Sequence, residues 1–312
     1  MPNAGAVMLR NQFTDLFVDR LPFLDEILYE MFDAPSLTYT SVFNVRDSQR
    51  AYEEITGITG FDQFSQKTEG DSIEYDQLLQ GYDKRYKHLT YAKGFSISLE
   101  AAADDIDGAI SNAAPALARV ARNSIETEAF SDFNNGFGTV TTPDGQALFS
   151  ASHALVAGGT FSNLVSGDLA QATLETALNI YDDMRDDRNQ LIELSAGILL
   201  FPPELKWLVH ELLQSQLRSD TANNAANALN LVGLRTVESK YLTGADDWFL
   251  LSEPSQHRLM FYWRQDPVSD HTIDFDTGNL KTKMTYRMSH GPADWRGLVG
   301  GQLESSGAEQ EA

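Results

Sequence analysis

The chain has 312 residues, 42% of them hydrophobic, so it is long enough to bury a core as one large domain or two modest ones. Its formal net charge of −22 disfavours a broad nucleic-acid or membrane-surface interface, because such interfaces need clustered lysine and arginine. The lack of cysteine excludes disulfides, thiolate catalysis, zinc ribbons and iron–sulfur ligation, and is compatible with a reducing cytosol.

Residues 1–60 are expected to form an N-terminal arm and the start of a core domain. Two amphipathic segments flank Pro22, which should break or kink them. An apolar arm must cover a surface, either on its own domain or on a neighbouring subunit. We find no secretory leader pattern and no apolar run approaching about 20 residues, so neither export nor a membrane span is expected.

Residues 61–96 have the pattern of a long two-stranded excursion around Gln80-Gly81. Its first limb is acidic and its second limb is basic, and opposite charges on paired strands help to fix their register. A hairpin of this length is marginal by itself, so we interpret it as an interface arm, with a solvated surface hairpin as the alternative. Its candidate inter-subunit contacts are Glu69, Asp71, Glu74, Asp76, Lys84, Arg85 and Lys87, and Lys93 adds to the basic limb.

The longest helical pattern covers residues 99–138, as a short helix that leads into a long one. We expect Asn112 to cap the long helix and Pro115 to lie in its first turn. Asn134-Asn135-Gly136 should end it, because these residues tolerate positive φ. The predicted buried stripe, at three-and-four spacing, is Ile106, Ile110, Ala113, Leu117, Val120, Ser124, Ala129 and Phe133.

A mixed α/β region follows the turn signature at 142–145. Asp168 is predicted to cap a helix, with Gln171 completing a capping box. The apolar run 196–201 predicts a buried central strand, which Pro202-Pro203 ends before an amphipathic helix begins.

The remaining segments are loops and strands. The small polar residues of 219–230 predict a loop, and 304–312 a disordered acidic end. The alternation of polar and apolar residues in 280–290 predicts a strand with one solvent-exposed face and one buried face. Further short strands are expected at 234–242, 248–251, 258–264 and 273–275.

No strong catalytic or ligand-binding pattern is found. The six histidines are too far apart to share a short metal-binding motif, and no phosphate-cradling glycine loop occurs. Ser150, Ser152 and His153 suggest a nucleophile and base, but Gly-x-Ser-x-Gly is absent. The aspartates and arginines of 182–188 indicate a solvated, self-paired helix end in preference to a cation site. We therefore expect no catalytic residue, metal or cofactor, and we interpret the four tryptophans as core or interface anchors.

The order of these parts resembles the major capsid proteins of tailed bacteriophages, which have the Hong Kong 97-like (Johnson) fold, and most of all the Mu-type major head subunits. Each motif is weak alone, but their joint order is specific, and the resemblance extends over about 61–301. The stretches that carry it are 96–105 (SISLEAAADD), 134–137 (NNGF), 144–153 (DGQALFSASH) with Gly158-Gly159, and 294–298 (DWRGL).

The resemblance implies an α+β fold with six parts. These are an N-terminal arm and the start of the peripheral domain at 1–60, an extended loop at 61–96, the peripheral domain with the spine helix at 97–167, an axial domain at 168–245, return strands of the peripheral and axial domains at 246–301 and an acidic disordered tail at 302–312.

It also implies a major capsid protein that self-assembles as hexamers and pentamers into an icosahedral shell around packaged double-stranded DNA. Assembly would take place in the host cytoplasm, with a portal protein at one vertex and scaffolding or decoration proteins as possible partners. Two alternatives stay open: the shell of an encapsulin-type nanocompartment and, from another class, a soluble serine hydrolase that uses Ser152 and His153.

Overall fold

The computed structural model describes residues 37–73, 75–77, 80–98, 109–156, 158–215, 228–274 and 276–303. The amphipathic segments around Pro22, the short helix expected before residue 109, most of the loop 219–230 and the acidic end therefore lie outside the described residues. Within these ranges the chain forms two compact units. Unit 1 contains Leu37, 88–126 and 263–288, and unit 2 contains 38–87, 127–262 and 289–303.

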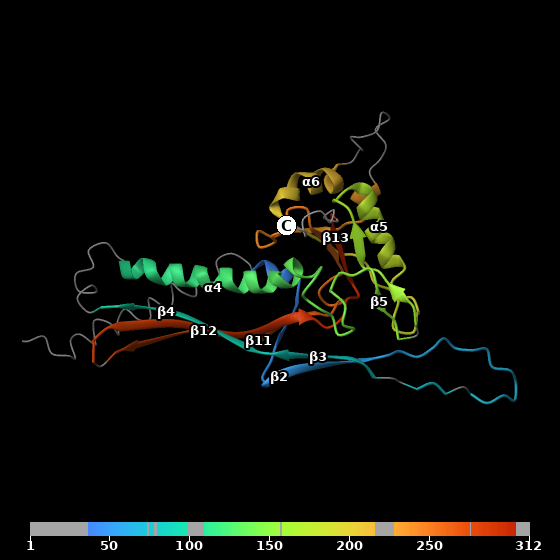
Figure 1. Cartoon of the computed structure of the whole chain (residues 1–312), viewed down its shortest axis with the longest axis horizontal. Helices are drawn as coiled ribbons and strands as arrows, with labels where there is room; N and C mark the ends of the chain where they lie inside the picture. The colour runs from blue at the N-terminus through green and yellow to red at the C-terminus, as the bar shows by residue number, and fades with distance from the viewer. Residues whose placement is uncertain are drawn as a thin grey trace, which may run out of the picture. The chain divides into compact units, whose positions relative to one another are not determined.

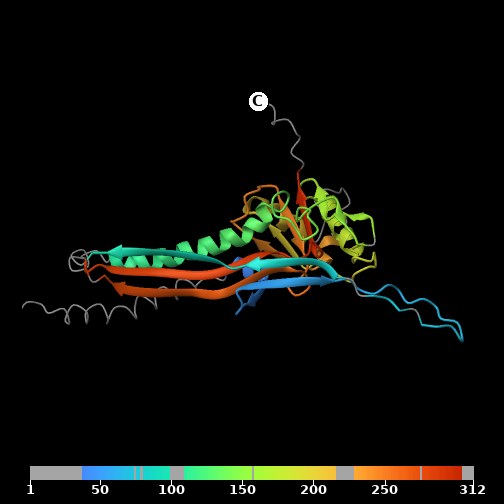
Figure 2. The same ribbon diagram turned by 60° about the horizontal axis from the view of Figure 1, so that its bottom comes forward.

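Unit 1 is built on paired strands with a helix along them. β4 (Leu89–Ile97) pairs antiparallel with β12 (Leu280–Pro292), from Leu280 opposite Ile97 to Met288 opposite Leu89. Their sheet has the order β1-β11-β12-β4, with β1 at Asn44–Asp47 and β11 at Leu259–Ile273. The first part of helix α4 (Ala109–Asn134) runs alongside β4 and β12 (Figures 1 and 2). The predicted alternation in β12 is confirmed, because Lys281 and Lys283 are exposed while Met284 and Met288 are buried.

The spine helix differs from its prediction at the start and along its stripe. α4 already begins at Ala109 and holds Pro115 inside it, since the fixed φ of proline suits a helix at the loss of one hydrogen bond. The side chain of Asn112 lies outside the described residues. Val120 is 39% exposed and does not belong to the buried stripe, which is Leu117, Ala118, Ala121, Ile125, Ala129, Phe130 and Phe133.

The end of α4 is confirmed, although positive φ is not its cause. The helix stops at Asn134, but none of Asn134, Asn135 and Gly136 has a positive φ. Gly136 is needed for space: a Cβ there would come within 2.8 Å of the Phe149 ring. The Asn134 side chain donates to the carbonyl of Tyr241 at 2.9 Å, which fixes the point where the helix ends.

Unit 2 is centred on a five-stranded sheet with the order β7-β13-β10-β8-β9. The apolar runs predicted as strands form β8 and β10, and all of their residues are buried. Helices α5 and α6 pack on the sheet through Leu174, Tyr181, Val209 and Leu213 (Figure 1). The elements are β7 (Leu164–Ser166), β8 (Ile198–Phe201), β9 (Arg235–Glu238), β10 (Trp248–Leu251), β13 (Leu298–Gln302), α5 (Gln171–Asp182) and α6 (Lys206–Gln214).

The predicted capping of α5 is wrong. Ala170, not Asp168, is the N-cap residue. The hydroxyl of Thr173 accepts the Ala170 N–H at 2.8 Å and donates to the Asp168 carbonyl at 2.8 Å. Threonine thus supplies the side-chain bond that was assigned to Gln171, because it lies three residues after the true cap.

An aromatic cluster joins the end of α4 to the sheet. Phe133 contacts Phe249 with ring centroids 5.0 Å apart, and Phe149 contacts Phe137 and Phe249, each at 5.1 Å. Of the tryptophans, Trp248, Trp263 and Trp295 are buried as core anchors, whereas Trp207 on α6 is 77% exposed. The remaining short elements are η1 (Thr38–Ser41), β5 (His153–Ala154), β6 (Thr160–Phe161), η2 (Pro203–Leu205) and η3 (Ala228–Leu231).

The predicted hairpin over 61–96 is wrong in its pairing. β3 (Gln80–Lys87) pairs antiparallel with β2 (Tyr52–Ile58), while β4 pairs with β12 in another sheet. The chain turns at Glu69-Gly70, where Gly70 has φ +91°, and not at Gln80-Gly81. Gly81 serves the close approach of β3 to β2, since a Cβ there would lie 3.2 Å from the Gly57 backbone.

None of the helices in the described part of the chain is long and apolar enough to cross a membrane.

Candidate functional site

The segment that joins β2 to β3, residues 59–79, is the main candidate for an interaction site. It continues as two limbs beyond the ends of these strands (Figures 1 and 2), and we call it the extended loop. Its apolar side chains are open to solvent: Phe61 is 58% exposed, Phe64 107%, Ile73 64% and Tyr75 88%. Burying a side chain of this size is worth roughly 1.5–3 kcal/mol, so four of them on one loop indicate a surface that another molecule covers.

The base of the extended loop is fixed by charged and polar bonds. One oxygen of Asp76 accepts the Asp62 N–H at 2.8 Å and lies 2.8 Å from Nη1 of Arg188. The Asp62 N–H contributes most to lowering the pKa of Asp76, with further contributions from the Gln77 N–H and from Arg188. Asp76 therefore stays an anion and links the two limbs to the segment around Arg188.

Some of the predicted contact residues are exposed, and others bond to residues of the same chain. Glu69, Asp71 and Lys87 are exposed, and Glu74 lies outside the described residues. Asp76 is bonded as above, and Lys84 Nζ donates to the Thr141 carbonyl at 3.2 Å. Burial lowers the pKa of Lys84, and the charge of Asp132 offsets part of that effect.

The expected pairing of the acidic limb with the basic limb is not observed. Arg85 instead lies opposite Glu54 of β2, with Nη2 3.3 Å from Oε1. Its guanidinium also lies 4.5 Å from the centroid of the Tyr52 ring. The charges of β3 thus fix the register of β2 and β3, because those two strands are neighbours in space.

Sequence reasoning missed two features of the loop. The apolar residues Phe64, Ile73 and Tyr75 stand singly among the polar residues of this stretch, and this was the available signal. Arg188 gave no such signal, since its partners Asp62 and Asp76 lie more than a hundred residues away in the sequence.

The residues of the hydrolase alternative form a buried structural network. His153 is fully buried, with Nδ1 2.7 Å from an Asp144 oxygen and Nε2 3.1 Å from the Asn163 side-chain oxygen. Both ring nitrogens face acceptors, so neither is free to take a proton from Ser152, which is exposed. Burial raises the pKa of Asp144, but the bonds from His153, Thr142 and the Gln146 N–H outweigh it and lower the pKa overall.

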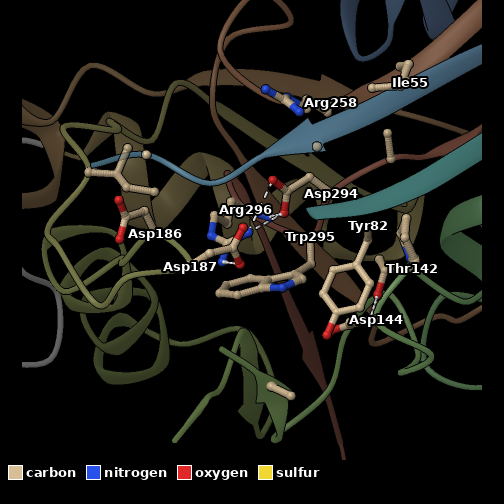
Figure 3. A pocket seen from close by; sticks show the side chains of 16 residues that line it. Ile55, Tyr82, Thr142, Asp144, Asp186, Asp187, Arg258, Asp294, Trp295 and Arg296 are labelled. Carbon is tan, nitrogen blue, oxygen red and sulfur yellow. Dashed lines mark hydrogen bonds and ion pairs between the residues drawn. The ribbon is translucent and has the colours of Figure 1, made fainter. Parts of the chain in front are cut away.

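A small pocket lies within unit 2 beside this network (Figure 3). Its volume is about 150 Å³, which is below the roughly 300 Å³ at which ordinary ligand sites begin. Arg296 lines it and bonds to Asp187 at 2.8 Å and Asp294 at 3.1 Å, and its guanidinium stacks on Trp295. These polar groups of the pocket therefore already bond to one another.

The acidic stretch 182–188 is not the self-paired helix end that was expected. Asp187 pairs with Arg296, and Arg188 pairs with Asp62 and Asp76, so the partners come from distant segments. No group of three or more histidine or acidic residues in the described ranges has the arrangement of a metal site.

Comparison with known families gives a match over most of the chain. A family model described as "Phage capsid protein" matches residues 81–300, from β3 through β13. No curated protein matches the sequence significantly.

Solved structures share the fold at low sequence identity. One from Mycobacterium phage Adephagia is 11% identical with a TM-score of 0.57, over 88% of this chain and 92% of its own. The bacteriophage PhiM1 mature capsid is 12% identical with a TM-score of 0.54, over 84% of each chain. A virus-like particle from Pyrococcus furiosus is 9% identical with a TM-score of 0.55, over 90% and 98%. These likenesses confirm the expected Hong Kong 97-like fold.

Proposed function

Since the chain belongs to the phage capsid protein family and is a major capsid protein that forms the phage shell, we propose that it assembles as hexamers and pentamers around packaged double-stranded DNA. The family match favours this function over a nanocompartment shell. The buried state of His153 gives no support to a serine hydrolase.

The extended loop is the observation that carries the mode of assembly. Phe64, Ile73 and Tyr75 are exposed on it, and no described residue of the same chain covers them. We propose that they dock on a second copy of the chain, because shell subunits present identical surfaces to one another. Glu69, Asp71 and Glu74 would then form a polar rim of this contact, while Asp76, Lys84 and Arg85 hold the loop and β3 in place within the subunit. Lys87 lies at the other end of β3, opposite Tyr52, and would be a separate candidate contact.

The wider assembly follows from the same proposal. Helices α5 and α6 with strands β8 and β9, which lie in the expected axial domain 168–245, would surround the symmetry axes of the capsomers, and β7, β10 and β13 complete their sheet from outside that range. The net charge of −22 suits a wall that encloses DNA without gripping its phosphates. A portal protein at one vertex, scaffolding or decoration proteins and assembly in the host cytoplasm complete the proposal.

Electron microscopy of a loop-shortened variant tests the assembly role. Residues 63–75 are replaced by a short glycine-serine linker, which keeps Asp62, Asp76, β2 and β3. We leave β3 intact because Tyr86 is only 2% exposed and its hydroxyl donates to the Gly291 carbonyl. We expect wild-type protein to form closed shells, and the variant to stay soluble with an unchanged melting temperature but form none.

Point variants supply a matched pair for the same assay. Phe64→Ser with Tyr75→Ser removes apolar contact area, whereas Gln66→Ser with Lys67→Ser changes two exposed polar residues of the same loop. Only the first pair should reduce shell yield. Closed shells from the loop-shortened variant would show that the extended loop is not an assembly contact.

A further inference from the structure

The turn 184–192 is a rigid mount for Arg188. An oxygen of Asp186 accepts the N–H groups of Arg188 and Gln190, both at 2.8 Å, and the Asp186 N–H donates to the Gln190 carbonyl at 2.8 Å. Asn189 at the tip has φ +63°, a conformation that asparagine tolerates. From outside the turn, Arg296 donates to the Arg185 carbonyl at 2.7 Å. These bonds leave the backbone around Arg188 little freedom.

Arg188 reaches from this mount to both limbs of the extended loop. Nη1 lies 2.8 Å from an oxygen of Asp62 on the outgoing limb and 2.8 Å from an oxygen of Asp76 on the returning limb. Nη2 donates to the Gln77 carbonyl at 2.6 Å. Gln190, on the same turn, donates to the Phe61 carbonyl at 2.6 Å. We call Arg188, Gln190, Asp62 and Asp76 the loop clamp.

The clamp lies between the strands and the apolar part of the loop. Phe64, Ile73 and Tyr75 all fall between Asp62 and Asp76 in the sequence, so the clamp closes the loop at its base. The Asp62 N–H bond to Asp76 holds the two limbs directly together there. The Arg188 side chain is only 11% exposed, so it acts from within the subunit and not at its surface.

The chemistry of the contact requires arginine. A planar guanidinium can serve two carboxylates and a carbonyl together, whereas a lysine ammonium offers a point charge without this fork geometry. A loop of this length without strand pairing would otherwise lose conformational entropy when it docks, and pre-ordering reduces that loss.

We propose that Arg188 is a positioning residue for assembly: it closes the base of the extended loop and so presents Phe64, Ile73 and Tyr75 to a second copy of this chain. The inference rests on the proposed function, because it takes the extended loop as the assembly contact. It adds that a residue far from the loop in sequence sets the efficiency of that contact.

Variants on both sides of the clamp test the proposal. Arg188→Gln and Arg188→Lys change the clamp on the side of the turn, and Asp62→Asn with Asp76→Asn changes it on the side of the loop without altering the turn. Lys67→Gln is the control, because it also removes one positive charge but from an exposed residue of the extended loop that takes no part in the clamp. Hydrogen exchange of unassembled full-length subunits reports the protection of the Asp62 and Gln77 amides, and light scattering reports the concentration at which shells form.

We expect Arg188→Gln and the double Asp variant to lose protection at both amides and to need about tenfold more protein for assembly, with Arg188→Lys in between and Lys67→Gln unchanged. Unchanged exchange in Arg188→Gln, or faster exchange with normal assembly, would overturn the positioning role. Failure of the proposed function is a different result, namely closed shells from the loop-shortened variant.

Discussion

Asn163 connects the turn-rich segment 142–163 to the central sheet of unit 2, and its replacement by alanine should be strongly destabilising. Its amide donates to the carbonyls of Leu148 at 2.8 Å and Leu298 at 3.0 Å, while its oxygen accepts the Ser150 N–H at 2.8 Å and faces His153 Nε2. Asn163 is fully buried, so water cannot replace these bonds freely.

The magnitude follows from counting the groups that Asn163→Ala leaves without this partner. Two carbonyls, one N–H and one ring nitrogen lose a bond, at roughly 1 kcal/mol or more each for buried groups, which gives about 4 kcal/mol in total. The unfolding entropy of a chain of 312 residues is about 0.65 kcal/mol/K, so a loss of this size lowers the melting temperature by about 6 °C.

Thermal unfolding of the unassembled subunit, followed by circular dichroism, measures the effect. Asn179→Ala on α5 is the control: this side chain is exposed, so the shift should stay within about 2 °C. Asn163→Asp keeps the size and the acceptor but turns an oxygen toward two carbonyls, and it should also destabilise. A shift below about 2 °C for Asn163→Ala would refute the assignment of this network as a structural hub.

Two further predictions concern α4. Burial lowers the pKa of His290, but Asp132, 2.8 Å from Nδ1, and Glu128, 4.0 Å from Nε2, raise it more, so the pKa of folded His290 lies above its ordinary 6.5. The stability that protonated His290 contributes is therefore fully present below pH 6.5 and is lost as the pH rises through the pKa of the folded state. In His290→Gln the melting temperature should depend less on pH between pH 6.5 and 9 than in the wild type. An unchanged pH dependence would contradict this. His257, whose pKa burial lowers to about 4, titrates below that window, and Lys84 is the cation that also faces Asp132. Val120→Pro should cost about 3 kcal/mol or more and reduce soluble yield, because it removes a backbone bond inside α4, while Val120→Ala should stay within about 0.5 kcal/mol; equal yields would mean that the helix tolerates a break there.

Short-range patterns predicted the elements whose structure depends on residues close together in the sequence. The alternation of β12 and the apolar runs of β8 and β10 follow from local periodicity. The order of these elements was sufficient to suggest the capsid fold, which the family match then supported.

Local patterns failed where a partner came from elsewhere in the chain. Val120 has the spacing of the buried stripe but is exposed to solvent, because tertiary packing decides which face of α4 is buried. Asn134-Asn135-Gly136 has the composition of a helix end with positive φ, but Gly136 is needed because a Cβ at this position would clash with the Phe149 ring.

The sequence by itself determined that the chain carries a long charged excursion before its longest helix, since charge and length are properties of the residues alone. Only the tertiary structure decided that β3 pairs with β2, that β4 belongs to another sheet, and that Arg188 closes the base of the extended loop. The physical reason is that opposite charges attract whichever partner folding brings near. Asp76 therefore pairs with Arg188, and Arg85 pairs with Glu54.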